Sequence, residues 1–169
     1  MPVRRLNHAV LYVRNVERSV AFYREALGFE VLTQFPGAAF LRASGSTNDH
    51  DLGLFEIGDD AGTSGAGRTT VGLYHLAWEV ETLTELEQLA ATLSAMGALV
   101  GASDHGTTKS LYVHDPDGLE FEVCWIVPAA QLSLVGERRA PTLPLDLDDA
   151  ITTFGASTVG GLGISWPAS

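Results

Sequence analysis

The chain has 169 residues, a hydrophobic fraction of 46% and a formal net charge of −11 at pH 7. This length suits one compact domain or two small halves that share a core, and no apolar run approaches the roughly 20 residues that a membrane-spanning helix needs. The acidic charge, without a basic stretch that could follow a phosphate backbone, argues against a nucleic-acid partner.

Cysteine content and the N-terminal segment restrict the protein further. The single cysteine, Cys124, excludes an internal disulfide and a thiolate zinc cluster, so any metal would be bound by histidine and carboxylate side chains. The first residues lead straight into an alternating segment, without the apolar core of a secretion signal. We therefore expect a soluble, cytoplasmic protein that engages no membrane.

The first half of the chain predicts a strand, a helix and three more strands. Residues 5–13 alternate polar and apolar side chains, as a half-buried strand does. Asn15 can cap a helix that runs to about residue 27 and ends at Gly28. Three further strands are predicted, at residues 29–35, 38–43 and 50–57.

The same order of elements is then repeated. Residues 58–70 contain four glycines and little that could pack, so we expect a flexible linker. A strand at 73–80 and a leucine-rich helix at 82–96, which ends at Gly97, follow the linker. Three more strands are predicted, at residues 98–103, 110–114 and 119–127.

The predicted fold class is therefore α+β, with residues 1–127 forming two βαβββ modules at about 4–57 and 71–127. We expect the modules to form a cupped mixed sheet around a metal site. Residues 128–169 contain several prolines, an acidic stretch and a glycine-rich end. This segment is expected to be a wrapping or partly disordered extension and not a domain.

Three residues at repeated positions predict that metal site. The modules can be overlaid so that His8 falls on His75 and residues 55–57 fall on 121–123, with both histidines in the first strand of their module. Glu122 lies between apolar neighbours in the last strand, where an unpaired carboxylate would be costly to desolvate. Two imidazoles and one carboxylate form the ligand set of a facial triad, which leaves about three positions open on a metal such as Fe(II). A lone strand histidine is usually a core or rim residue, but the three positions together favour a metal site.

Several segments resemble the vicinal oxygen chelate superfamily, which includes glyoxalase I, bleomycin resistance proteins and type I extradiol dioxygenases. The segments are residues 74–80, 104–106 and 111–122, the last of which contains the turn Asp115-Pro116-Asp117-Gly118. The resemblance covers about residues 5–127 and implies the paired-module fold. Two-domain extradiol enzymes carry two such module pairs, whereas this chain has one.

The resemblance is most specific for the extradiol dioxygenases. Ring-cleaving members keep two more histidines and a tyrosine around the metal, in a chain order that His50, His105 and Tyr112 match. The resemblance implies that a small aromatic diol and dioxygen meet at Fe(II). His50 would then act as an acid or charge stabiliser toward oxygen, and His105 and Tyr112 would hydrogen-bond the diol and steer proton transfer.

Two other functions remain open. Glu56 falls on Glu122 in the overlay, and glyoxalase-type members use both positions as ligands in a four-ligand Ni(II) or Zn(II) site that isomerises a thiol adduct of a 2-oxoaldehyde. Mn(II) is a further candidate metal. Related proteins also bind antibiotics or metabolites without turnover, usually as dimers, and we expect a homodimer here.

Other candidate residues have simpler interpretations. Cys124 shares the Glu122 face by strand parity but is expected to be a packed, buried thiol. Trp78 and Trp125 are expected to pack in the core, and His114 is expected to have no role in the site.

Overall fold

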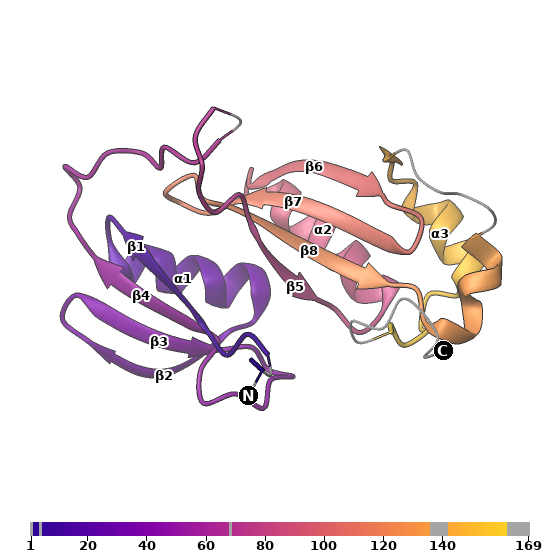
Figure 1. Ribbon diagram of the computed structural model, residues 1–169, viewed down its shortest axis with the longest axis horizontal. Coiled ribbons are helices and arrows are strands. Elements are labelled where there is room, and N and C mark those ends of the chain that lie inside the picture. Colours follow the sequence, from indigo (N-terminus) through magenta and orange to yellow (C-terminus); the bar gives the residue numbers. More distant parts are fainter. Residues whose placement is uncertain (1, 4, 68, 136–141, 162–169) are drawn as a thin grey trace. The chain divides into compact units, whose positions relative to one another are not determined.

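The structure, a computed structural model, describes residues 2–3, 5–67, 69–135 and 142–161. The protein divides into two compact units, Met1–Ser64 with Asp115–Gly118 and Gly65–His114 with Leu119–Ser169. In each unit a helix lies against one mixed sheet (Figure 1). Positions 4 and 68 of the predicted first module and linker, and positions 136–141 and 162–169 of the predicted extension, lie outside the described residues.

The first unit is a four-stranded sheet with α1 on one face. Its elements are β1 (Ala9–Val13), α1 (Val16–Leu27), β2 (Glu30–Phe35), β3 (Ala38–Arg42) and β4 (Leu52–Glu56). The strands lie in the order β1-β4-β3-β2, with β1 parallel to β4 and the other pairs antiparallel. The helix begins after Asn15, whose side chain accepts a hydrogen bond from the backbone N–H of Arg18, and it ends at Gly28, where a φ of 66° favours glycine.

The core of the first unit lies between α1 and the sheet. The buried apolar side chains of the helix and strands include Val16, Val20, Tyr23, Ala26, Leu41, Leu52 and Leu54. Because side chains alternate along a strand, Phe40, Gly53 and Phe55 point to the opposite face of the sheet. The face of a sheet that points away from its helix is called the far face below.

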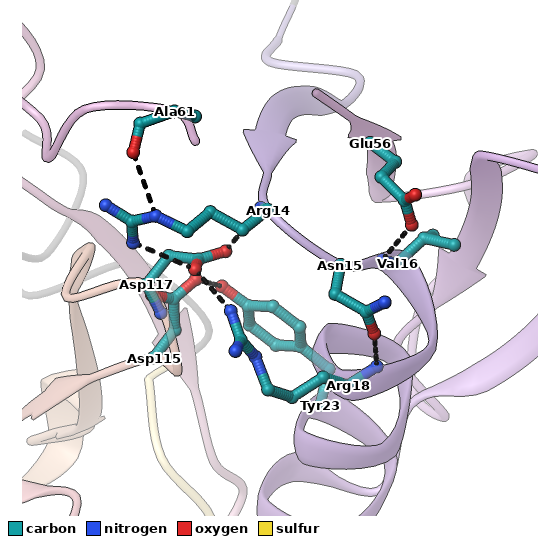
Figure 2. Close-up of polar contacts among 9 residues, drawn as sticks. All are labelled: Arg14, Asn15, Val16, Arg18, Tyr23, Glu56, Ala61, Asp115 and Asp117. Atoms are coloured by element: carbon teal, nitrogen blue, oxygen red, sulfur yellow. Dashed lines mark hydrogen bonds and ion pairs between the residues drawn. The ribbon is translucent and has the colours of Figure 1, made fainter. Parts of the chain in front are cut away.

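The turn at Asp115–Gly118 belongs to the first unit and contacts the start of α1 (Figure 2). The Asp117 carboxylate accepts hydrogen bonds from the backbone N–H of Arg14 at 2.9 Å and from the Arg14 and Arg18 guanidinium groups at 3.2 and 2.7 Å. Asp115 accepts a hydrogen bond from the Tyr23 hydroxyl at 3.2 Å. The side chain of Asp117 is only 7% exposed, so these donors offset the cost of removing its charge from water.

The second unit repeats this plan and adds elements at its C-terminal end. Its elements are β5 (Leu76–Glu79), α2 (Leu83–Ala95), β6 (Leu99–Asp104), β7 (Thr108–His114), β8 (Glu120–Ile126), the 3₁₀ helix η1 (Ala129–Val135), β9 (Leu143–Pro144) and α3 (Leu147–Phe154). The strands lie in the order β5-β8-β7-β6-β9, with β5 parallel to β8. A capping box between Thr82 and Glu85 starts α2. Among the described residues, no helix has the length and apolar character needed to cross a bilayer.

The described part of the C-terminal extension packs on the second unit. β9 pairs with the edge strand β6, and the Phe154 ring of α3 lies 5.6 Å from the Trp125 ring. The Trp125 indole donates a hydrogen bond to the carbonyl of Thr158 at 3.1 Å. Trp125 is fully buried, in agreement with the predicted core role.

The predicted α+β fold class is confirmed, with two mixed sheets of four and five strands. Both predicted helices are present: α1 begins after Asn15 and ends at Gly28, and α2 spans Leu83–Ala95 within the predicted range 82–96. Three strands are shorter than predicted, so His8, His50 and His75 precede strands β1, β4 and β5 and do not lie within them. The alternating pattern continues into these residues, but the ladder between parallel strands begins only at Ala9 and Leu76.

We expect Asp117→Asn to lower the free energy of unfolding by about 2 to 3 kcal/mol, because it leaves two arginines facing a neutral amide in a largely buried position. Urea denaturation measures this change. Glu30→Gln is the control, since the Arg42–Glu30 pair is exposed and should contribute less than about 0.5 kcal/mol. Equal effects of the two substitutions would contradict the assigned role of the turn.

Candidate active site

Four predicted site residues lie on one side of the second unit. In β8, Phe121, Val123 and Trp125 point toward the helices, so Glu122 and Cys124 point to the far face. Tyr112 of β7 pairs directly with Glu122, and Ala77 of β5 pairs with it on the other side. His75 immediately precedes β5, and His105 lies in the turn between β6 and β7.

The carboxylate of Glu122 joins two of these groups. Its Oε2 lies 3.1 Å from Nε2 of His75, and its Oε1 accepts a hydrogen bond from the hydroxyl of Ser110 at 2.5 Å. Glu122 is 9% exposed, so these contacts satisfy a carboxylate that water barely reaches. When Nε2 of His75 carries its proton it can donate to Glu122, and a metal ion would take the place of that proton.

A second carboxylate lies behind His75. Nδ1 of His75 and Oε1 of Glu120 are both buried without a hydrogen-bond partner and lie 3.9 Å apart. A metal-binding histidine usually donates its second ring N–H to a carboxylate or carbonyl, which fixes the ring and its tautomer. The donor set and these orphaned atoms fit a metal bound through Nε2 of His75.

Two groups near His75 and Glu122 are absent from the sequence prediction. Ser110 could have been found by strand parity, because it lies two residues before Tyr112 and therefore shares its face. Glu120 shares the same parity with Glu122. Its second neighbour is His114, whose Nε2 lies 3.7 Å from Oε2 of Glu120.

Tyr112 and His105 form a hydrogen-bonded pair beside His75. The Tyr112 hydroxyl lies 2.8 Å from Nε2 of His105, and its ring centroid lies 5.8 Å from that of His75. Burial and then the nearby charge of Glu122 raise the pKa of Tyr112. The phenol therefore keeps its proton at neutral pH and can hydrogen-bond without ionising.

The first unit brings together the other two predicted histidines. The ring centroids of His8 and His50 lie 4.4 Å apart. The His50 and Phe40 rings pack edge to face, with their centroids 5.1 Å apart. Nδ1 of His8 contacts Asn7 at 2.8 Å, and Nδ1 of His50 contacts Asp49 at 3.1 Å. Within either unit, the described residues contain no group of three or more His, Cys, Asp or Glu side chains arranged to hold a metal.

Strand register corrects the predicted overlay of the modules. In both units the residue after the histidine is the first to pair with the last strand of the module: Ala9 with Leu52, and Leu76 with Phe121. On this register Glu122 corresponds to Gly53, and Glu56 lies three residues further along β4. The antiparallel ladders agree, since Phe40 pairs with Gly53 as Tyr112 pairs with Glu122.

Aligning the two modules by residue spacing places Glu56 on Glu122, which is wrong. The connections between strands differ in length in the two modules, and these differences nearly cancel. Phe40 and Gly53 are 13 residues apart, whereas Tyr112 and Glu122 are 10 apart. A shorter stretch before β3 offsets this longer connection, so Glu56 follows His8 at nearly the distance at which Glu122 follows His75. Equal spacing therefore does not mean equivalent positions here.

Glu56 lies on the helix side of its strand. It shares strand parity with the buried Leu52 and Leu54, and its Oε2 accepts a hydrogen bond from the backbone N–H of Val16 at 3.0 Å (Figure 2). A carboxylate at a helix N-terminus is favourable because it meets unpaired N–H groups and the positive end of the helix dipole. This contact accounts for Glu56 without a metal.

The chain belongs to the Glyoxalase/Bleomycin resistance protein/Dioxygenase superfamily, whose family model matches residues 5–123. The catechol-2,3-dioxygenase of Bacillus subtilis is 34% identical over 118 residues, which cover 70% of this chain and only 40% of that protein. The lactoylglutathione lyase of Neisseria meningitidis serogroup A is 32% identical over 124 residues, 70% of this chain and 88% of that one. The crystal structure of a glyoxylase/bleomycin resistance protein/dioxygenase domain from Frankia sp. has a TM-score of 0.61 at 26% identity, covering 73% and 92% of the two chains.

Cys124, on the same strand as Glu122, is expected to react slowly with thiol reagents. Cys124 is buried as expected, and burial, then the charges of Glu122 and Glu79, raises its pKa to about 12. At pH 8 the folded protein should therefore carry about a thousandfold less thiolate than an unfolded chain with a cysteine pKa of about 8.5. We expect a disulfide reagent to label denatured protein within minutes and folded protein far more slowly.

The same pKa shift has a consequence for stability. Because the folded state holds the thiol proton more tightly than the unfolded state, this group should lower stability as pH rises from about 8.5 toward 12. The unfolded protein is the matched control for reactivity, since it presents the same single thiol. Rapid labelling at pH 8 of protein that circular dichroism shows to be folded would contradict the prediction.

Proposed function

We propose that this protein is a metal-dependent, extradiol-type ring-cleavage dioxygenase that acts on a catechol-like aromatic diol. The observation that carries the proposal is that His75 and Glu122 share the far face of one sheet with the hydrogen-bonded pair His105–Tyr112. Glyoxalase-type isomerisation has no use for that pair. The dioxygenase relative matches the chain over only 40% of its own length, so its activity enters as part of the proposal.

The proposed metal ligands are His8, His75 and Glu122. Two imidazoles and a carboxylate with open positions suit Fe(II), with Mn(II), Ni(II) and Zn(II) as alternatives. Bound Fe(II) would supply adjacent positions at which the diol and dioxygen meet and exchange electrons. Glu120 behind His75 and Ser110 beside Glu122 would hold the ligand atoms in place.

Tyr112 and His105 would handle the diol protons. Since the phenol of Tyr112 stays neutral, its hydroxyl can hydrogen-bond a diol oxygen while it contacts Nε2 of His105. An imidazole can act as both acceptor and donor of a proton, which is the role proposed for His105. The proposed product is a ring-opened semialdehyde acid.

His50 would act on the oxygen side of the reaction as an acid or charge stabiliser. Its ring lies beside His8, the proposed ligand of the same unit, and against Phe40. Phe40 also contacts Phe55, so the far face of the first sheet carries aromatic side chains next to the two histidines. A planar, apolar ring is the kind of substrate that such a surface suits.

The alternative is a glyoxalase-type lyase, favoured by the lactoylglutathione lyase relative, which the chain matches over 88% of its length. A glyoxalase-type reaction would need Glu56 as a fourth metal ligand and as a base. The hydrogen bond from Val16 to Glu56 and the register of β4 count against this role. We therefore place the lyase second.

One assay separates the two functions. The purified protein would be loaded anaerobically with Fe(II) and exposed to oxygen with a panel of catechols, while oxygen uptake and the absorbance of the ring-opened product are followed. Turnover of any diol supports the proposal. The proposal would be overturned if no diol is turned over and the Ni(II)-loaded protein isomerises a hemithioacetal. Tight catechol binding without turnover would indicate a binding protein. Light scattering would test the homodimer that the family resemblance implies.

We expect His75→Ala to weaken Mn(II) binding, measured by calorimetry, by more than about 100-fold. Loss of an outer-shell partner alone costs about 10- to 100-fold in metal affinity, so loss of a ligand should cost at least as much. The matched control is His114→Ala, which removes a half-exposed imidazole outside the proposed ligand set. Equal affinities of the two variants would exclude His75 as a ligand.

We expect Tyr112→Phe to lower kcat for ring cleavage by about 10²- to 10⁴-fold, the range typical of a lost acid-base group. Metal content should stay unchanged, because the hydroxyl that is removed contacts His105 and not the ligand atoms. Stopped-flow oxygen consumption and metal analysis on the same preparation measure both quantities. A fall in metal content that matches the fall in rate would instead assign Tyr112 to metal binding.

A further inference from the structure

The C-terminal extension reaches the turn that carries His105. The match to the family model ends at residue 123, so this segment lies outside that match. β9 pairs with β6, and Leu143 lies opposite Asp104. Because the strands are antiparallel, Thr142, which precedes Leu143, lies beside His105, which follows Asp104. The Thr142 hydroxyl lies 3.2 Å from Nδ1 of His105.

The turn itself is held by a buried ion pair. Oδ1 of Asp104 accepts hydrogen bonds from the backbone N–H of Gly106 at 2.7 Å and from the ammonium group of Lys109 at 2.5 Å. The same ammonium donates to the carbonyl of Gly106 at 3.0 Å. Lys109 is 4% exposed, so breaking these contacts would leave a buried charge without partners.

The extension also covers this lysine and is fastened to the sheet. The Lys109 ammonium lies 5.1 Å from the centre of the Phe154 ring in α3, at a distance suited to a cation–π contact. Further along, the backbone N–H of Gly161 donates to the carbonyl of Ile126 at 2.8 Å. Thr142 therefore belongs to a segment that is attached to the second unit at several points.

His105 is thus placed between two hydroxyl groups. A neutral imidazole has one N–H donor and one acceptor nitrogen, so its two partners must play opposite parts. A phenol is a more acidic donor than an aliphatic alcohol, so the Tyr112 O–H is expected to donate to Nε2. Nδ1 then carries the hydrogen and donates it to the Thr142 oxygen.

We propose that Thr142 is a positioning residue that holds His105 in the Nδ1–H tautomer and so leaves Nε2 ready to accept a proton from Tyr112. The catalytic consequence rests on the proposed function. A diol O–H would transfer its proton to the Tyr112 oxygen while the Tyr112 proton passes to Nε2 of His105. The products of this step are a diol anion, neutral Tyr112 and an imidazolium whose Nδ1–H remains bonded to Thr142, so protons and charge balance.

The tautomer can be measured without metal or substrate. We would record ¹⁵N chemical shifts of the His105 ring in the metal-free full chain, at a pH where the imidazole is neutral, with His105→Gln used for assignment. The wild type should show mainly the Nδ1–H form. Thr142→Val, which removes the acceptor, should make Nε2–H the major form, and Thr142→Ser should restore the wild-type pattern.

Thr152→Val is the matched control, because Thr152 is an exposed residue of α3 in the same extension. It should leave the His105 shifts unchanged, and an unchanged melting temperature for Thr142→Val would show that the fold is intact. Identical His105 shifts in wild type and Thr142→Val, or a shift that Thr142→Ser does not reverse, would overturn the proposal.

Turnover provides a separate readout. If the chain cleaves diols, kcat should fall about tenfold in Thr142→Val, with KM and metal content unchanged, and recover in Thr142→Ser. A changed tautomer with full kcat would overturn the catalytic part of the proposal. If Thr142→Val loses the Nδ1–H form but the wild type turns over no diol, the tautomer result supports the positioning of His105. The absence of turnover then counts only against the proposed function.

Discussion

The site depends on the register of β8 between β5 and β7. Side chains of a strand alternate between two faces, so the pairing of Glu122 with Tyr112 on one side and Ala77 on the other decides what shares its face. A shift by one residue would turn Glu122 toward the helices and bring Phe121 or Val123 to the far face. The apolar residues of β8 therefore hold the carboxylate in place, because their burial against α2 allows only one register. This is why a polar site can be built on the most buried strand of the unit.

The same burial makes Glu122 dependent on its partners. A carboxylate with little access to water must be paired, and here Ser110 donates to one oxygen while His75 lies beside the other. A divalent ion at this position would stabilise the Glu122 carboxylate more than a proton on His75 does. Metal binding should then stabilise the folded chain, because the ligand atoms are brought together only in the folded state. The Glu120 carboxylate lies 3.9 Å from Nδ1 of His75, on the side of the ring away from Glu122.

Much of the fold and part of the site could be predicted from the sequence. Helix ends at Asn15, Gly28 and Thr82 follow from local capping chemistry, and the shared face of Tyr112, Glu122 and Cys124 follows from strand alternation. Register between strands could not be predicted in the same way, because it depends on connection lengths that differ between the modules, and this made Glu56 look equivalent to Glu122. The contact of Thr142 with His105 joins residues 37 apart in the chain. It depends on β9 pairing with an edge strand, and a two-residue strand leaves no periodic pattern to read.

The corrected register also shows how the two modules differ in chemistry. At equivalent positions the second unit has Tyr112 and Glu122 where the first has Phe40 and Gly53. The glycine has no side chain that could act as a ligand, and a Cβ atom there would be in ordinary van der Waals contact with apolar atoms, 3.4 Å from Val10 and 3.5 Å from the Phe40 ring. The first unit therefore offers an imidazole next to an aromatic surface, while the second offers an imidazole, a carboxylate and a phenol.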